Sequence, residues 1–161
     1  MIYLPETEAQ KEFLLKWAMK IIGLRGLVMP YPIGIFVGDD ENPRIACVAI
    51  YHDHRPPNVF MSIASINPHW ATKKNIGALY SFAFTPRPVG LGVNRITALA
   101  DKVNKRSRKF IKGIGFREEG CIRKGGSNGE DLILYGLLRN ELKVRERNIS
   151  VEADIRKLNY G

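Results

Sequence analysis

The chain has 161 residues, of which 45% are hydrophobic and 25% charged, and 25 Lys and Arg against 16 Asp and Glu give a formal net charge of +9. This length allows one domain with a sizeable core, and the composition excludes wholesale disorder, a collagen-like chain and a scaffold held by many disulfides. The excess of positive charge favours an anionic partner, which leaves nucleic acid, a phosphorylated cofactor and an acidic surface open.

The cysteines and the first residues indicate the compartment. Cys47 and Cys121 stand in apolar runs without metal-ligand spacing, so both are predicted to be small buried side chains in a reduced, cytoplasmic setting. Residues 1–6 lack the basic and apolar regions of a signal peptide, and no apolar run nears the roughly 20 residues of a membrane span. The sequence therefore predicts a protein that is neither secreted nor membrane-spanning.

The first half of the chain predicts a helix, three strands and a second helix. Thr7 and Gln10 have the spacing of a capping box, and apolar residues then recur on one helical face until Gly23. β-prone runs between turn-rich segments predict an antiparallel meander of three strands, over residues 33–37, 45–51 and 59–66. A second helix is expected between Trp70 and Phe84, because apolar residues keep helical spacing there and a segment rich in proline and glycine follows.

The second half predicts a strand, a helix and two closing strands. Residues 95–100 form a short β-prone run, and Asn104 with Ser107 opens a third helix. Two further strands are predicted to pair around a glycine-rich turn, over residues 116–123 and 132–138. The predicted order of elements is therefore α-β-β-β-α-β-α-β-β, which is the order of a single mixed α/β domain.

The segment after residue 100 carries a recognisable motif. Its pattern is N-x-x-S, then a helix, then G-F-x-x-E-G, and it is formed by Asn104, Ser107, Gly115, Phe116, Glu119 and Gly120. This pattern resembles the GNAT superfamily of acyl-CoA-dependent N-acetyltransferases. The resemblance extends to the strand over residues 95–98 and to the last strand, through Asp131, Tyr135, Gly136, Leu138 and Arg139. Trp70, before the second helix, is similar to a tryptophan of ribosomal-protein N-terminal acetyltransferases and of many phage-encoded members.

The resemblance implies a GNAT-like fold, with a mixed, mostly antiparallel central sheet that is V-shaped in the middle and flanked by helices. It covers nearly the whole chain and implies an acetyltransferase domain over residues 1–142. Residues 143–161 form a tail in which apolar residues at helical spacing predict a short helix. This tail is expected to pack on the domain or on a second copy of the chain, so a monomer and a homodimer are both open.

The resemblance also implies acetyl-CoA as co-substrate, with its pyrophosphate at the start of the second helix, where backbone N–H groups and the helix dipole favour an anion. The residues at that place are Thr72, Lys73, Lys74, Asn75, Ile76 and Gly77. The family pattern there is Q/R-x-x-G-x-G/A, of which this chain keeps the final glycine. Asn75 tolerates left-handed dihedrals, and the two lysines offset phosphate charge. The alternative is an ordinary helix start with exposed lysines.

Three further residues are implied to hold the pantetheine arm. Ile66 and Asn67 fall where the family's strand separates from its neighbour and exposes its backbone to the ligand. Asn104 is expected to bind the same arm, and the N-cap of the third helix is a second role that is compatible with the first.

Catalysis requires an acid for the departing thiolate and a path for the proton of the amine. Many family members place a tyrosine acid seven residues after the asparagine, where this chain has Ile111. Ser107 of the N-x-x-S pattern is the candidate replacement, and the resemblance also places it among the residues that bind the cofactor. Candidates for the base are Asp53, His54, Glu118 and Glu119, and the sequence does not select one of them.

Histidine and glycine patterns suggest other chemistries that the sequence does not favour. His52 and His54 stand two apart, the spacing at which side chains of a strand share a face, but a polar hairpin end is the simpler interpretation and no metal is predicted. Gly90 and Gly92 lack the third glycine and the flanking elements of a dinucleotide-binding loop.

The positive charge is concentrated in residues 101–125, which contain nine Lys and Arg and three Asp and Glu. Lys105, Lys109 and Lys112 are predicted to line the outer side of the third helix, opposite Phe110 and Ile111. Three interpretations stay open for this basic side, namely a solvated surface, attraction of the CoA phosphates, or contact with a nucleic-acid backbone.

The functional prediction is transfer of an acetyl group from acetyl-CoA to a primary amine, with a protein or peptide as the preferred acceptor, in the cytoplasm of a bacterial or phage-infected cell. The alternative is a non-catalytic module of the same fold that binds nucleic acid or an acidic host protein through the basic helix. A third hypothesis joins the two, in which the amine belongs to an RNA-linked acceptor such as an aminoacyl-tRNA.

Overall fold

In the computed structural model, residues 1–142 are described. The helix predicted in the tail lies outside these residues. The other predicted elements are all present, and the structure adds β1 and two short 3₁₀ helices. In chain order the elements are β1 (Ile2–Tyr3), α1 (Glu8–Ile22), β2 (Tyr31–Val37), β3 (Arg44–Arg55), β4 (Asn58–Ser65), η1 (Pro68–Trp70), α2 (Lys73–Phe84), β5 (Arg95–Asp101), α3 (Lys105–Gly113), β6 (Arg117–Ile122), β7 (Leu132–Leu138) and η2 (Arg139–Glu141).

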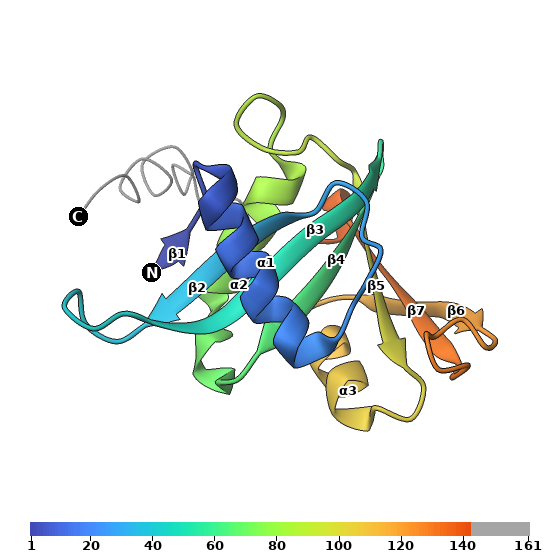
Figure 1. Ribbon diagram of the computed structural model, residues 1–161. Helices are drawn as coiled ribbons and strands as arrows, with labels where there is room; N and C mark the ends of the chain where they lie inside the picture. Colours follow the sequence, from blue (N-terminus) through green and yellow to red (C-terminus); the bar gives the residue numbers. More distant parts are fainter. Residues whose placement is uncertain (143–161) are drawn as a thin grey trace.

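Seven strands form one mixed sheet in the order β1-β2-β3-β4-β5-β7-β6 (Figure 1). β2, β3 and β4 form the predicted antiparallel meander, and β7 lies between β5 and β6 and is antiparallel to both. β4 and β5 are the one parallel pair among the described strands. The predicted mixed, mostly antiparallel sheet is therefore confirmed.

The parallel pair separates after three residues. Asn58–Phe60 of β4 pairs with Arg95–Thr97 of β5, and the rest of each strand then diverges from the other. Figure 1 shows the two strands running in the same direction and moving apart towards the end of the sheet where α3 lies. We call this opening the fork. It forms the predicted V in the middle of the sheet.

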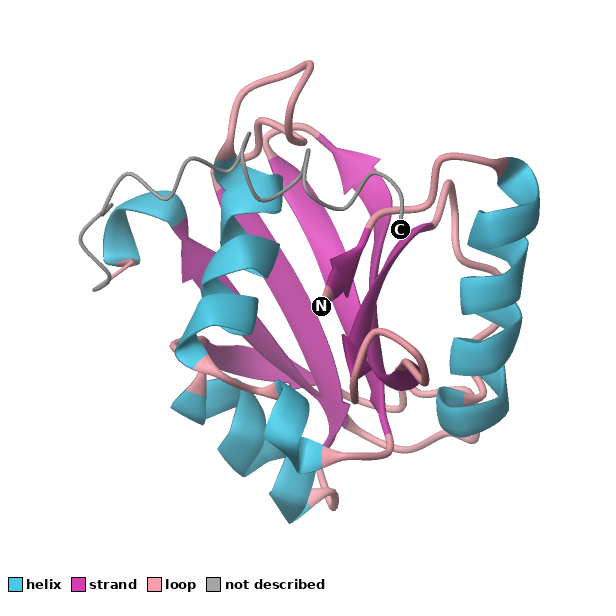
Figure 2. Ribbon diagram, turned by 90° about the vertical axis from the view of Figure 1, so that its left-hand side faces the viewer, coloured by secondary structure: helices cyan, strands magenta, loops and turns pink. Residues whose placement is uncertain are grey.

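Helices cover the two faces of the sheet unequally (Figure 2). α1 packs on the β2–β4 half of one face through Leu14 and Ala18, which meet Val48, Ile50 and Ala64. α2 and α3 lie on the other face, over a larger core that includes Tyr51, Trp70, Leu79, Ile96, Phe116 and Tyr135. The α1 side of β5, β7 and β6 carries no helix in the described part of the chain.

Local sequence explains where the helices begin and end. Thr7 and Gln10 form the predicted capping box at the start of α1, and Gly23 ends that helix with a φ of 62°. α2 ends where a loop turns back over it, because the N–H groups of Leu91 and Val93 bind the carbonyl groups of Phe82 and Ala83.

Two expectations about single residues are wrong. Cys47 is buried as predicted, but Cys121 is exposed, because it lies on β6, an edge strand whose residues are all exposed. β3 continues to Arg55, four residues past its predicted end, so Asp53 and His54 lie in a strand and not in a turn. Among residues 1–142, no helix combines the length and apolar character that a membrane crossing requires.

Candidate functional site

Two helix N-termini stand at the open end of the fork. β4 leads through η1 into α2, whose N-cap is Thr72, and β5 leads into α3, whose N-cap is Asn104. Because β4 and β5 are parallel and diverge towards their carboxyl ends, both helices start where the fork is widest. Two groups of residues predicted to bind the cofactor, residues 72–77 and Asn104 with Ser107, lie at these two helix starts. The fold therefore brings the two groups to one end of the sheet.

The first turn of α2 has the donors that an anion site requires. Thr72 Oγ1 accepts a hydrogen bond from Asn75 N at 3.2 Å, and Asn75 Nδ2 donates to the carbonyl oxygen of Trp70 at 2.6 Å. The N–H groups of Lys73 and Lys74 precede the first intrahelical hydrogen bond, so the helix leaves them available. A Cβ built on Gly77 meets no atom within 4 Å. The left-handed conformation considered for Asn75 is not adopted, because this residue lies inside the helix.

The backbone that faces the fork lies slightly earlier than predicted. Met61–Ser65 of β4 pairs with β3 on one side and with none of the described strands on the side of the fork. Ile66 lies just past the strand with an exposed side chain, and Asn67 accepts a hydrogen bond from His69 N at 2.9 Å and so caps η1. The stretch available for strand-like pairing with a ligand is therefore Met61–Ser65, which is adjacent to the predicted pair.

The start of α3 has the predicted local structure. Asn104 Oδ1 accepts a hydrogen bond from Ser107 N at 3.0 Å. Ser107 Oγ has no hydrogen-bond partner among the described residues. Ile111, where the resemblance implies a tyrosine in many family members, packs with Phe110 against the main core. Asn104 is thus confirmed as an N-cap, and its contact with a cofactor stays a prediction.

Glu118 and Glu119 are both held in ion pairs. Glu118 lies 2.9 Å from Lys112 Nζ and 3.4 Å from the Arg108 guanidinium, and these cations, Lys112 foremost, lower the pKa of its carboxyl. Glu119 binds the Arg95 guanidinium through both oxygens, at 3.0 and 2.5 Å, and this pairing lowers the pKa of Glu119. A carboxylate with a lowered pKa is a weaker base, so neither glutamate suits the role of proton acceptor.

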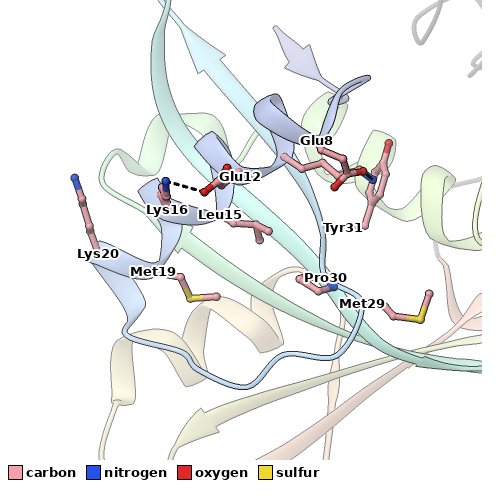
Figure 3. A pocket seen from close by; sticks show the side chains of 10 residues that line it. Glu8, Glu12, Leu15, Lys16, Met19, Lys20, Met29, Pro30 and Tyr31 are labelled. Atoms are coloured by element: carbon pink, nitrogen blue, oxygen red, sulfur yellow. Dashed lines mark hydrogen bonds and ion pairs between the residues drawn. The ribbon is translucent and has the colours of Figure 1, made fainter.

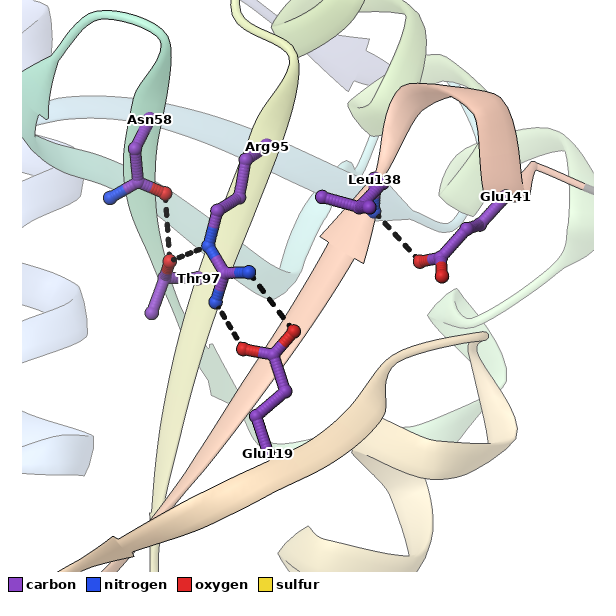
Figure 4. A network of polar contacts seen from close by, with 6 residues as sticks. All are labelled: Asn58, Arg95, Thr97, Glu119, Leu138 and Glu141. Carbon is purple, nitrogen blue, oxygen red and sulfur yellow. Dashed lines mark hydrogen bonds and ion pairs between the residues drawn. The ribbon is translucent and has the colours of Figure 1, made fainter.

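The Arg95–Glu119 pair belongs to a network on the α1 side of β5 (Figure 4). Arg95 Nε donates to Thr97 Oγ1 at 3.0 Å, and Thr97 Oγ1 donates to Asn58 Oδ1 at 2.7 Å. The pair lies over Gly136, because a Cβ there would come within 2.7 Å of both side chains. This network joins β4, β5 and β6 at the closed end of the fork. Sequence reasoning missed it, since the three strands come together only in the fold.

The two histidines considered for a metal have different partners. His52 contacts Asp53 and Ser62, whereas His54 Nδ1 lies 3.2 Å from an Arg87 nitrogen. Burial, followed by the positive charge of Arg87, lowers the pKa of His54. Within residues 1–142, no three His, Cys, Asp or Glu side chains are grouped so as to hold a metal ion.

The outer side of α3 is basic as predicted. Lys105, Lys109 and Lys112 are exposed, whereas Phe110 and Ile111 are partly buried against the core. Lys112 is bound to Glu118, and this contact offsets part of the positive charge on the helix surface.

A separate groove of about 880 Å³ lies along α1 (Figure 3). Its walls are side chains of α1, among them the ion pair of Lys16 and Glu12, and residues 29–31 at the start of β2. None of the residues predicted from the sequence to bind a cofactor lines this groove.

Comparison with solved structures identifies the architecture. Spermidine N-acetyltransferase from Vibrio cholerae, in a dodecameric form, matches 91% of this chain and 97% of its own with a TM-score of 0.63 and 13% identity. A protein from Desulfovibrio desulfuricans assigned to the GNAT family matches 86% of this chain and 98% of its own, with a TM-score of 0.59 and 12% identity. The chain has the GNAT fold.

A third GNAT-fold neighbour comes from T. thermophilus and is assigned as an acetyltransferase. It matches 98% of this chain and 78% of its own, with a TM-score of 0.59 and 20% identity. No family model and no curated protein matches the sequence. At these identities the likeness establishes the fold, and the activity has to be argued from the residues of the fork.

Proposed function

We propose that the protein is an acetyl-CoA-dependent N-acetyltransferase that acts on a primary amine. The fork carries this proposal, because it presents an unpaired strand edge and two helix N-termini at one end of the sheet in the described part of the chain. An extended arm that ends in phosphates fits this combination, since its amides pair with a strand edge and its phosphates favour helix N-termini. Acetyl-CoA is such a molecule, and when bound it supplies an activated acetyl thioester.

The residues of the fork divide the binding between them. The backbone of Met61–Ser65, with Asn104 across the fork, binds the pantetheine arm. The N–H groups of Lys73 and Lys74 bind the pyrophosphate, and their ammonium groups offset its charge. The open space beside Gly77 supports this assignment, because a ligand can approach the helix closely there.

Ser107 is proposed as the acid that protonates the departing sulfur. Its hydroxyl group is free of protein partners in the described structure and stands in the first turn of α3, where the helix dipole stabilises developing negative charge. The family's tyrosine position does not supply the acid here, since Ile111 has no ionisable group.

The proposed acceptor is an amine of a protein or peptide. One neighbour of the same fold acts, by its name, on spermidine, a small polycation. A net charge of +9 repels a polycation at long range, so a peptide amine, which carries fewer charges, is the better match for this chain.

Isothermal titration with acetyl-CoA tests the proposal. The unaltered chain is expected to bind, and Lys73→Glu with Lys74→Glu is expected to weaken binding at least tenfold, about 1.4 kcal/mol. Arg25→Glu with Arg44→Glu is the matched control, since it changes the net charge equally at exposed residues outside the fork. No detectable binding at millimolar acetyl-CoA would refute the enzyme.

A nucleic-acid binding assay at several salt concentrations separates this function from nucleic-acid binding. Contact of Lys112 and Arg108 with Glu118 leaves fewer free cations on α3 for a phosphate backbone. A steep loss of nucleic-acid binding with rising salt, without binding of acetyl-CoA, would favour the non-catalytic module.

A further inference from the structure

Three side chains on the α1 side of the sheet form a continuous hydrogen-bonded chain. His52 Nδ1 lies 2.6 Å from Asp53 Oδ2, and His52 Nε2 lies 2.9 Å from Ser62 Oγ. His52 is 8% exposed, whereas Ser62 and Asp53 are partly accessible. The carboxylate only accepts, so in the neutral imidazole Nδ1 carries the proton and Nε2 offers its lone pair to the hydroxyl group of Ser62.

A bulge in β3 creates this contact. Consecutive side chains of a regular strand point to opposite faces, so Asp53 would ordinarily turn away from His52. Here the β3–β4 register shifts after His52, and Asp53 has a φ of 50°, which aspartate tolerates better than most residues. The N–H of Asp53 binds the carbonyl oxygen of Val28 at 2.8 Å, so a neighbouring loop holds the bulge in place.

The hydrogen-bonded side chains end at Ser62, where the fork begins to open. Phe60 is the last residue of β4 that pairs with β5, and Ser62 lies two positions further on the same face. His52 is opposite Phe60 in the β3–β4 ladder and stacks on its ring at 5.9 Å. Ser62 is therefore the first side chain on the α1 side where β4 has left β5.

The two sides of the fork differ in chemistry. α3, with Ser107, packs on one face of the sheet, and Ser62 with His52 lies on the opposite face, next to the area that no described helix covers. A molecule lying in the fork is thus approached from one side by a hydroxyl group that is backed by imidazole and carboxylate.

We propose that Ser62 and His52 accept the proton of the acceptor amine, with Asp53 as the positioning residue that holds the imidazole in the required tautomer. This inference rests on the proposed acetyl transfer and deepens it, because it supplies the base that the sequence did not select. Of the four sequence candidates, Asp53 acts through His52, His54 is turned towards Arg87, and the two glutamates are held in ion pairs.

Atoms and electrons balance in the proposed transfer. The amine nitrogen forms a bond to the acetyl carbon, and the carbon–sulfur bond of the thioester breaks. The proton that leaves the nitrogen passes to Ser62 Oγ while the Ser62 proton passes to His52 Nε2, and His52 later releases a proton to solvent. The sulfur gains its proton from Ser107, which regains one from solvent. No oxidant or further reactant is required.

The first test observes the imidazole directly. Two-bond ¹H–¹⁵N spectra of the full chain contain only three histidines, which His52→Gln, His54→Gln and His69→Gln assign. We expect His52 to be the Nδ1–H tautomer and its Nε2 signal to shift on addition of acetyl-CoA. Binding of acetyl-CoA without any change at His52 would overturn the proposal, and this outcome is decisive even if no amine probe is acetylated.

The second test measures acetyl transfer to tryptic peptides of serum albumin and to spermidine over a range of pH. His52→Gln is expected to lower kcat about 100-fold, with a small change in the KM for acetyl-CoA. Asp53→Asn is expected to lower kcat and to reduce the share of the Nδ1–H tautomer of His52 in the two-bond spectra, because an amide, unlike a carboxylate, can also donate a hydrogen bond to the ring nitrogen. Asp40→Asn, at an exposed turn, is the matched control.

The outcomes separate this inference from the proposed function. If acetyl-CoA does not bind, the acetyltransferase is refuted and the relay with it. If the unaltered chain transfers acetyl groups and His52→Gln keeps both its rate and its pH profile, only the relay is wrong. A trapped acetyl group on Ser62, detected by mass spectrometry, would replace the relay with a covalent route.

Discussion

At the scale of single residues, neighbouring side chains of the same type have different surroundings. Glu118 and Glu119 are consecutive on β6 and point to opposite faces of the sheet, so Glu118 contacts the cations of α3 and Glu119 contacts Arg95 on β5. Both pKa values lie below the ordinary 4.5, so the stability from each pair is present above that pH and is lost as pH falls through the lowered value.

Glu119→Gln tests the Arg95 pair. We expect a loss of about 1 kcal/mol in the free energy of unfolding at pH 7, since the pair is bidentate but partly exposed. The loss is expected to shrink as pH falls below 4.5. Urea unfolding at pH 7 and pH 3.5 measures it, with Glu41→Gln, in an exposed turn, as the control. An equal loss at both pH values would contradict the ion-pair explanation.

His54 also makes the fold less stable as pH falls, but over a higher pH range than the two glutamates. Its Nε2 is buried without a partner among the described residues, and burial and Arg87 lower its pKa below the ordinary 6.5. The unfolded chain therefore takes up the proton first, and stability falls as pH drops from 7.5 through 6.5. His54→Gln is expected to reduce the drop in Tm between pH 7.5 and 5.5, and His69→Gln, at an exposed position, is not. An unchanged drop in His54→Gln would show that this imidazole is not the cause.

At the scale of elements, α2 connects the two halves of the sheet, and backbone groups at both of its ends are bound by neighbouring residues. Its start holds the proposed phosphate site, and its end is covered by the loop that leads to β5. Gly90 makes this cover possible, since a Cβ there would lie 2.4 Å from the carbonyl oxygens of Phe82 and Thr85.

Gly90→Ala and Gly77→Ala are a matched pair of changes at one helix. Gly90→Ala is expected to cost about 3 kcal/mol, because backbone has to move to admit the methyl group. Gly77→Ala places its methyl group in open space within the helix and is expected to stabilise the chain by about 0.5–1 kcal/mol. Thermal unfolding of both variants measures these effects, and similar Tm values for the two would contradict the proposed loop contact.

At the scale of the whole molecule, the sheet consists of two parts joined at the closed end of the fork. The β1–β4 part and the β5–β7–β6 part share a ladder of three residue pairs and the side-chain network around Arg95. A ligand that pairs with β4 and reaches both helix N-termini binds across this junction, so it is expected to stabilise the whole fold.

Acetyl-CoA is therefore expected to raise Tm, by an amount that corresponds to about 2.7 kcal/mol at one hundred times its dissociation constant. Hydrogen exchange is expected to slow in Met61–Ser65 and in the first turns of α2 and α3, and not in β6. Lys73→Glu with Lys74→Glu is expected to reduce both effects at the same ligand concentration. Protection confined to the groove along α1 would place the binding site elsewhere.

Local sequence determined much of the fold. The capping box at Thr7, the N-cap at Asn104 and the turn-rich segments between β-prone runs depend on neighbours within a few residues, so the helices and long strands are predicted close to their bounds. β1 was missed because two residues carry no periodicity, and Cys121 was misplaced because an apolar run does not reveal that its strand lies at an edge. The resemblance at N-x-x-S by itself implies the GNAT fold.

Tertiary structure decided where the chemistry lies. The fork forms because β4 and β5, distant in sequence, pair over three residues and then diverge. The unpaired edge of β4 is therefore Met61–Ser65, and not the predicted Ile66 and Asn67. His52 and Ser62 meet through the register of two strands and a bulge at Asp53 that no local pattern specifies. The charge excess is visible in composition, but the pairing of Lys112 with Glu118 depends on helix packing. Sequence determines contacts between near neighbours, whereas register, bulges and strand divergence follow from how the whole core packs.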